Sequence, residues 1–328
     1  MARRSGMFWV CALLATVGGI YLIKHFTMYP DTGDEISWKA PPDDTKEEGT
    51  RNAVPLLAPR EQPMANAVPL LQTKEQPMES AVPLLQTKEQ QMESAKNLRW
   101  LVEKRPVDYK CGKKVRLPNY RSTDSWTYCA DPAFLPTKPC LVYSFGVNWD
   151  FSFEDAMEKA GCEVMSYDPS MDTVAHRHSP SVMFQPVGLG HRDSDIFVPH
   201  KNNQVKKPTQ WQIRTLKTLV EQNKHSERTI DILKFDIETY EWNVTRNMID
   251  SGVLSQVKQL LLEWHIFPHL PRREQFLQLA TVIQDLDKIG FRHFYKFAHG
   301  VNPNWEHFNL QSDMGYVNTN FTKKEKKK

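Results

Sequence analysis

Apolar and polar residues alternate with two different periods from about residue 96 onward. Apolar runs with the two-residue period of a strand are separated by longer segments with the period of an amphipathic helix. The pattern predicts strands at residues 141–145, 163–167, 182–185, 230–237, 259–264, 292–298 and 308–317, and helices at 151–160, 211–222, 240–250 and 274–289. This alternation is typical of an α/β fold with a doubly wound, mostly parallel sheet, which we place at residues 96–322.

A repeat precedes this domain. Residues 53–94 consist of three copies of a 14-residue unit that starts Ala-Val-Pro-Leu-Leu, and Gln91 in the third copy replaces Pro77 of the second. Prolines interrupt a helix, and a repeat without aromatic residues has little to bury. The sequence therefore predicts a disordered, proline-rich stalk at residues 24–95 that acts as a spacer. Short docking motifs within the repeats are the alternative.

An uninterrupted apolar run occupies residues 7–23 and follows Arg3 and Arg4. Its 17 residues reach the length of a short membrane-spanning helix, and the preceding basic residues favour a cytosolic amino terminus. The run predicts a single-pass type II membrane protein with a cytosolic tail at 1–6 and a signal-anchor at 7–23. A cleaved signal peptide is the alternative. The α/β domain would then face the lumen of the Golgi or secretory pathway, or the cell exterior.

Charge and cysteine content bear on the partners and the compartment of the domain. The formal net charge is +3, but the basic tail at residues 323–328 alone carries +4, so no broad surface for nucleic acid is predicted. Asn243 and Asn320 begin N-glycosylation sequons, so a luminal domain is expected to be a glycoprotein. The domain has four cysteines, which are Cys111, Cys129, Cys140 and Cys162. They would permit up to two disulfides, with three possible pairings.

Carboxylates gather at the end of the strand at 230–237, where Asp236 and the following Glu238 alternate with apolar residues. Parallel α/β sheets keep their ligand crevice at the carboxyl ends of the strands, so these two acids predict a functional site. An edge strand with a solvated face is the alternative. The next strand also ends in polar groups that share a face, Glu263 and His265. No metal site is predicted, because no third ligand accompanies Asp236 and Glu238.

A glycine and an acid at two other strand ends predict a nucleotide-type ligand. Gly146 ends the strand at 141–145, and Asp168 ends the next strand 22 residues later. Dinucleotide-type folds place a glycine turn at the first strand end and, about 20 residues on, an acid that accepts the ribose hydroxyls. Gly146 lacks the usual glycine-rich pattern, so an ordinary turn glycine and an Asp-Pro turn are the alternatives.

Four segments, in this order and at this spacing, together resemble the methyltransferase-like protein 24 family, which is related to the FkbM-type methyltransferases. They are Cys140-Leu-Val-Tyr-Ser-Phe-Gly146, Cys162-Glu-Val-Met-Ser-Tyr-Asp-Pro169, Ile230-Asp-Ile-Leu-Lys-Phe-Asp-Ile-Glu238 and Lys258-Gln-Leu-Leu-Leu-Glu-Trp-His265. The resemblance covers about residues 96–320. It implies a Rossmann-like class I methyltransferase fold with a seven-stranded sheet whose last strand is antiparallel, and S-adenosyl-L-methionine as the cofactor.

The resemblance also implies roles for particular residues. Residues in contact with the cofactor would be Ser144, Phe145, Gly146, Asp168, Gly188 and Asp236. Asp168 would hold the ribose hydroxyls, and Gly188 would lie near the adenine. Asp236, Glu238 and His265 would be catalytic, with Glu238 or His265 as a base if methyl transfer needs one. The family has glycine after the second acid, whereas this chain has Thr239, a β-branched residue that could narrow the pocket or displace the loop.

These features predict a membrane-anchored, S-adenosylmethionine-dependent methyltransferase that acts on a luminal or extracellular acceptor. The acceptor is left open among a glycan, a secreted protein, a lipid and a small molecule, and nucleic acid is not expected. One alternative is a Golgi-type glycosyltransferase, since Asp193-Ser-Asp195 has the Asp-x-Asp form that holds a metal and a sugar nucleotide. The other is a catalytically degenerate methyltransferase fold that serves as a binding module, which Thr239 would favour.

Overall fold

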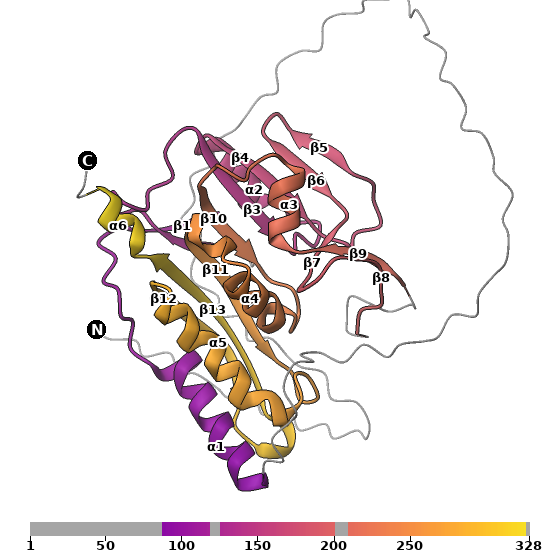
Figure 1. Cartoon of the computed structure of the whole chain (residues 1–328), viewed down its shortest axis with the longest axis vertical. Coiled ribbons are helices and arrows are strands. Elements are labelled where there is room, and N and C mark those ends of the chain that lie inside the picture. The colour runs from indigo at the N-terminus through magenta and orange to yellow at the C-terminus, as the bar shows by residue number, and fades with distance from the viewer. Residues whose placement is uncertain (1–86, 119–124, 201–208, 326–328) are drawn as a thin grey trace, which may run out of the picture. The chain divides into compact units, whose positions relative to one another are not determined.

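A mixed sheet of eight strands forms the centre of the domain, in the order β12-β13-β11-β10-β3-β4-β6-β5 (Figure 1). The structure is a computed structural model that describes residues 87–118, 125–200 and 209–325. The strands of this sheet are β3 (Cys140–Phe145), β4 (Cys162–Tyr167), β5 (His176–Ser179), β6 (Val182–Gln185), β10 (Ile230–Phe235), β11 (Val257–Ile266), β12 (Phe291–Asn302) and β13 (Asn309–Asn318). The neighbours β6, β4, β3, β10 and β11 pair in parallel, which confirms a mostly parallel sheet.

The two outer regions of the sheet are antiparallel. The last strand, β13, runs antiparallel between β11 and β12, as the family resemblance implies. The expected number of seven strands is wrong by one, because β5 pairs antiparallel with β6 and adds an edge. β5 has the sequence His-Arg-His-Ser, and no period of apolar residues marks it as a strand.

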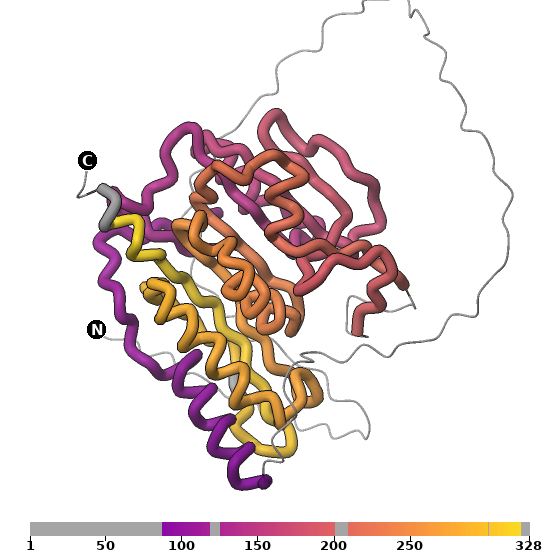
Figure 2. Tube along the Cα trace, viewed as in Figure 1, coloured from indigo at the N-terminus to yellow at the C-terminus, as the bar shows by residue number. Residues whose placement is uncertain are grey.

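Four helices cover one face of the sheet: α1 (Lys88–Arg99), α3 (Leu216–Gln222), α4 (Glu241–Asp250) and α5 (Phe276–Lys288). Successive strand residues point to opposite faces, so Leu141, Tyr143 and Phe145 of β3 join the same buried cluster as the apolar stripes of these helices. Figure 2 shows α1 alongside α5, although the two helices are far apart in the sequence.

The opposite face carries fewer helices. It is covered by α2 (Ser152–Lys159), the short α6 (Asn320–Glu325) and a hairpin of β1 (Lys114–Leu117) and β2 (Trp126–Cys129). Two disulfides lie in this region, and of the three pairings that the sequence leaves open the structure has Cys111–Cys129 and Cys140–Cys162. The doubly wound prediction is thus correct for the helices on both faces, but it misses the hairpin.

A second, small sheet of three strands lies in the order β7-β9-β8. Its strands are β7 (Gly188–Leu189), β8 (Ser194–Phe197) and β9 (Trp211–Arg214). The prediction of a single helix at 211–222 is therefore wrong for its first four residues, which form β9, and α3 begins only at Leu216. Thr215 separates the two elements, since its hydroxyl oxygen accepts from the Thr218 N–H at 3.2 Å and so caps α3.

The folded domain extends at both ends into segments predicted as disordered. α1 begins inside the predicted stalk, where Thr87 and Gln90 form a capping box and Ala95 is buried. Gln91 stands where the second repeat has a proline, and its N–H donates to the Thr87 carbonyl at 3.0 Å in the first turn of the helix. The backbone of residues 323–325, predicted as the start of a basic tail, continues α6.

Several predictions concern segments outside the described residues. These are the cytosolic tail at 1–6, the signal-anchor at 7–23, the stalk up to residue 86 and the end of the basic tail at 326–328. Within the described part of the chain, none of the helices has the length and apolar character needed to cross a membrane.

Candidate active site

The carboxyl ends of β3, β4 and β10 border a pocket, which the small β7-β9-β8 sheet and the start of α4 also line. Six of the eight residues predicted for the site line it, and these are Phe145, Gly146, Asp168, Gly188, Asp236 and Glu238. The strand ends therefore bring six of the predicted residues together at one pocket.

Gly146 is the point where the first strand end meets the turn at Asp236. Its φ is +80°, in the left-handed region that favours glycine, and an added Cβ would lie 1.9 Å from the Asp236 carbonyl oxygen. The Asp236 N–H donates to the Phe145 carbonyl at 3.2 Å, and the Gly146 N–H donates to the Tyr167 carbonyl at 3.0 Å. Glycine at this position thus lets three strand ends converge on one pocket.

Asp168 is held by backbone groups at the end of β4 and is only 4% exposed. Its Oδ1 accepts from the Ser170 N–H at 2.8 Å and the Ser170 hydroxyl at 2.6 Å, while Oδ2 accepts from the Asn148 N–H at 2.8 Å. A carboxylate oxygen can accept two hydrogen bonds, so Oδ2 keeps capacity for a ligand hydroxyl. Asp168 is therefore fixed in position and still suited to bind a ribose.

The turn after β10 holds both predicted acids. β10 ends at Phe235, so Asp236 and Glu238 lie in the turn that leads into α4 rather than on a strand. Glu238 and Thr239 have φ values of +57° and +83°, where L-residues cost about 1–2 kcal/mol each. Burial raises the pKa of Glu238; the His265 imidazole opposes this rise, and the Asp236 and Glu241 carboxylates add to it. Thr239 therefore occupies a backbone conformation that favours the glycine of the family pattern.

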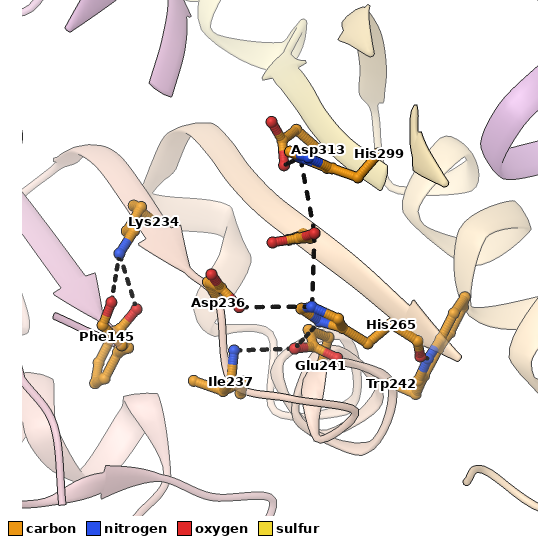
Figure 3. Close-up of polar contacts among 11 residues, drawn as sticks. Phe145, Lys234, Asp236, Ile237, Glu241, Trp242, His265, His299 and Asp313 are labelled. Carbon is orange, nitrogen blue, oxygen red and sulfur yellow. Dashed lines mark hydrogen bonds and ion pairs between the residues drawn. The ribbon is translucent and has the colours of Figure 1, made fainter. Parts of the chain in front are cut away.

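Lys234 links β10 to the Gly146 turn by hydrogen bonds. The side chain is fully buried, and its Nζ donates to the Gly146 carbonyl at 2.8 Å and to the Phe145 carbonyl at 3.3 Å (Figure 3). The same Nζ lies 5.2 Å from the centroid of the Trp126 ring, within cation–π distance. A buried lysine thus supports the pocket from a position that does not line it.

His265 of β11 lies among carboxylates (Figure 3). Its Nδ1 is 3.0 Å from Glu241 Oε1, and its Nε2 is 3.6 Å from Glu263 Oε1 and 3.8 Å from Asp236 Oδ1. Burial alone lowers the pKa of His265, but the three carboxylates outweigh it and raise the pKa to about 10. The imidazole is therefore charged at neutral pH in the absence of a ligand, which does not suit the predicted role of base.

Glu263 lies between His265 and His299, and His299 pairs with Asp313 (Figure 3). His299 Nε2 lies 2.7 Å from Asp313 Oδ1 and 3.7 Å from Glu263 Oε1. Burial and the carboxylates of Asp236 and Asp313 raise the pKa of Glu263 to about 8. The imidazoles of His265 and His299 oppose this rise. Acid and imidazole groups thus alternate from Asp236 at the pocket to Asp313 on β13.

Two of the predicted site residues do not line the pocket. Ser144 is fully buried on the opposite face of β3 from Phe145, and its hydroxyl donates to Glu154 Oε1 at 2.5 Å. His265 is 2% exposed and lies beside Asp236, which lines the pocket. The structure therefore gives Ser144 a packing role and puts His265 next to the pocket lining.

Aromatic residues that the sequence pattern did not single out line much of the pocket: Tyr167, Phe197, Trp211 and Tyr240. The rings of Phe145 and Tyr167 stack with centroids 4.8 Å apart, and the Asn223 side-chain amide donates to the Tyr167 hydroxyl at 2.7 Å. Tyr167 directly precedes Asp168, so its strand-end position could have identified it. No local pattern marks Phe197 and Trp211, because the small sheet brings them to the pocket.

The Asp-x-Asp motif lies outside the pocket lining. Asp193 accepts from the Thr215 N–H and the Thr218 hydroxyl, both at 2.8 Å, at the start of α3. Asp195 forms an ion pair with Arg214 of β9. These contacts explain both acids by local structure and remove the observation that favoured a glycosyltransferase.

A family model described as a methyltransferase domain matches residues 70–317. The chain belongs to this methyltransferase-domain family. Similar proteins include two named "Probable methyltransferase-like protein 24". The one from Rattus norvegicus is 30% identical over 213 residues, 59% of this chain and 56% of that protein, and the one from Homo sapiens is 29% identical over 231 residues, 61% and 60%. This confirms the family resemblance, and the chain spans less than two thirds of the length of these curated relatives.

The methyltransferase domain also overlaps with solved structures. Streptococcus pneumoniae Sp1610 in complex with S-adenosyl-L-methionine gives a TM-score of 0.28 at 10% identity, covering 57% of this chain and 69% of that one. A Streptococcus agalactiae protein of the NADB-Rossmann superfamily gives 0.24 at 11% identity, covering 55% and 63%. Scores of this size carry no argument, so the family assignment rests on the sequence match.

Proposed function

We propose that the methyltransferase domain binds S-adenosyl-L-methionine in its pocket and transfers the methyl group to a nucleophile held near Asp236 and Glu238. The observation that carries the proposal is the convergence of Gly146, Asp168 and Asp236 on one pocket in a chain of the methyltransferase family. The cofactor expected from the sequence, S-adenosyl-L-methionine, is consistent with membership of that family.

The residues of the pocket fit this cofactor. Asp168 has acceptor capacity for a ribose hydroxyl, and the bare backbone at Gly146 permits close approach of a ligand. Asp236 and Glu238 add negative charge beside aromatic rings, an environment that favours a sulfonium cation. When bound, S-adenosylmethionine supplies an electrophilic methyl group, so the protein needs no nucleophile of its own.

The residues of the chain then align and deprotonate the acceptor. Methyl transfer is an in-line displacement that needs the nucleophile and the methyl group aligned at near-attack distance. In this proposal Asp236 orients the cofactor or acceptor, and Glu238, which lines the pocket, accepts the acceptor's proton. His265 holds Asp236 electrostatically rather than acting as the base. The acceptor is a glycan, a secreted protein, a lipid or a small molecule.

We also propose that the chain is a type II membrane protein whose domain works in an oxidising lumen or outside the cell. The apolar run at 7–23 supports the anchor. The two disulfides, Cys111–Cys129 and Cys140–Cys162, support the compartment, because such bonds persist mainly in oxidising environments. Topology can be tested by protease protection of the chain in sealed membranes, where residues 96–322 are expected to be protected.

The cofactor is tested by calorimetric titration of the purified full-length chain with S-adenosylmethionine, and in parallel with UDP-sugars plus Mn²⁺. We expect binding of S-adenosylmethionine that Asp168→Ala weakens about 10–100-fold, since hydrogen bonds to a charged group are worth about 1.5–3 kcal/mol. Asp155→Ala is the matched control, because that carboxylate contacts His178 away from the pocket.

Each outcome separates the candidate functions. Binding of S-adenosylmethionine and methyl transfer to an acceptor panel support the proposal. Binding without transfer to any acceptor would favour the degenerate module, for which the backbone of Thr239 is the structural observation. A chain that binds UDP-sugars and not S-adenosylmethionine would exclude methyl transfer.

A further inference from the structure

We propose that Asp236, Glu263 and His265 form a binding site for one zinc ion beside the pocket. Their ligand atoms lie within 4.8 Å of one another. Sequence patterns offer no third ligand for Asp236, but β11 pairs in parallel with β10 and brings Glu263 and His265 to the same edge of the sheet. The third ligand is thus supplied by the fold.

The spacing of these atoms suits metal coordination better than direct hydrogen bonding. His265 Nε2 lies 3.6 Å from Glu263 Oε1 and 3.8 Å from Asp236 Oδ1, whereas N–H···O bonds span about 2.7–3.2 Å. Tetrahedral zinc with ligands at about 2.0–2.2 Å places neighbouring ligand atoms about 3.3–3.6 Å apart. The third pair, Asp236 and Glu263, lies within 4.8 Å, so side-chain shifts of up to about 1 Å would complete the site.

A second, independent observation is the way in which His265 is held (Figure 3). The side chain is 98% buried, and its Nδ1 faces Glu241 Oε1 at 3.0 Å. Glu241 is itself fully buried, and the same oxygen accepts from the Ile237 N–H at 2.9 Å. Metal-binding histidines almost always give their second ring nitrogen to such a carboxylate. This contact directs Nε2 into the triad, where no acceptor among the described residues lies within hydrogen-bond distance.

The chemistry of the ligands indicates the kind of metal. One imidazole nitrogen and two carboxylate oxygens suit zinc, since imidazole favours borderline ions over magnesium or calcium. Three protein ligands with one open position are the usual arrangement of catalytic zinc sites. Zinc would replace the proton on Nε2 and would leave Glu241 as the outer partner of the histidine.

Asp236 belongs to both the triad and the pocket lining. An ion bound there could coordinate an acceptor hydroxyl and lower its pKa, which would make a hydroxyl-bearing acceptor the substrate class. This use of the ion rests on the proposed methyl transfer. The metal site itself rests only on the geometry of the triad.

The test is a titration of the full-length chain, stripped of metal by a chelator, with Zn²⁺ alone against a chromophoric competitor. We expect Glu263→Gln and Asp236→Asn to lose one zinc equivalent, and Glu241→Gln to weaken binding about 10–100-fold. His178→Gln, a histidine outside the cluster, is the matched control. Circular dichroism checks the folding of each variant. If Glu263→Gln fails to fold, Asp236→Asn decides, because that side chain is 30% exposed.

Equal zinc content and affinity in the wild type, Glu263→Gln and Asp236→Asn would overturn the proposal. Loss of the site in His299→Gln but not in Asp236→Asn would also overturn it, because the ion would then lie in the neighbouring Glu263–His299–Asp313 group. Calorimetry with S-adenosylmethionine on the same preparations separates the two proposals. Cofactor binding without zinc binding rejects the metal site alone, and zinc binding without cofactor binding rejects only the methyltransferase reaction.

Discussion

Gly146→Ala is the substitution that most directly tests how the pocket is built. The Gly146 φ of +80° lies where an alanine costs about 1–2 kcal/mol. The new Cβ would also lie 1.9 Å from the Asp236 carbonyl oxygen, a contact that forces the backbone to move. Overpacking of this kind costs about 1–3 kcal/mol. The free energy of unfolding should therefore fall by about 2–5 kcal/mol.

Gly252→Ala separates the two contributions. Gly252 has a similar φ of +74°, but nothing lies within 4 Å of an added Cβ. This control should lose only the conformational cost of about 1–2 kcal/mol and should keep the pocket intact. Urea denaturation of both variants measures the difference in unfolding free energy, and calorimetry measures S-adenosylmethionine binding.

The contact with Asp236 predicts that Gly146→Ala weakens cofactor binding and that Gly252→Ala does not. Equal losses of stability in the two variants, with unchanged cofactor binding in both, would refute the reasoning. In that case the close approach of Gly146 to the Asp236 turn would not be what forms the site.

Three further predictions concern residues around the site and the core. Thr239→Gly should leave the free energy of unfolding unchanged or raise it by up to about 1 kcal/mol in urea denaturation, because glycine relieves the positive φ; a clear loss would contradict this. Lys234→Met should lower it by about 1–3 kcal/mol, since two carbonyls next to the pocket lose their donor, and an unchanged urea midpoint would count against that role. Burial lowers the pKa of His293 despite the Asp108 carboxylate, so this residue binds more protons in the unfolded chain and its contribution to stability falls as the pH drops below about 6.5. On lowering the pH from 7.5 to 5.5, the urea midpoint should therefore change more favourably in His293→Gln than in the wild type.

The parts of the fold that local pattern determines were predictable from the sequence. The strands at 141–145 and 163–167 match β3 and β4 closely, because both faces of a central strand are buried and the apolar run is continuous. Strand ends then located Gly146 and Asp168. The start of α1 was also readable, from Thr87, Gln90 and the loss of a proline at position 91, but the repeat obscured it.

What local pattern could not supply are contacts between elements far apart in the sequence. Trp211 reaches the pocket through a small sheet whose pairing depends on residues on both sides of the segment at 201–208. Likewise, β11 and α4 bring His265 and Glu241 together, so the charge on the histidine follows from tertiary burial beside carboxylates. The sequence alone predicted His265 as a possible base, a role that needs a neutral imidazole, whereas its surroundings in the fold favour the charged form.

The disulfide between Cys140 and Cys162 joins the first residues of two neighbouring strands whose last residues lead into the pocket at Gly146 and Asp168. Closing a loop with a separation of 22 residues stabilises the folded chain by about 3–4 kcal/mol in the chain-entropy description. A thiol reductant would cleave this bond at the end of the strands opposite the pocket. It would contact none of the lining residues, but it would remove the stabilisation that the bond gives to the two strands. Ligand binding is therefore expected to depend on the redox history of the preparation, and protein made under reducing conditions would understate the affinity of the site.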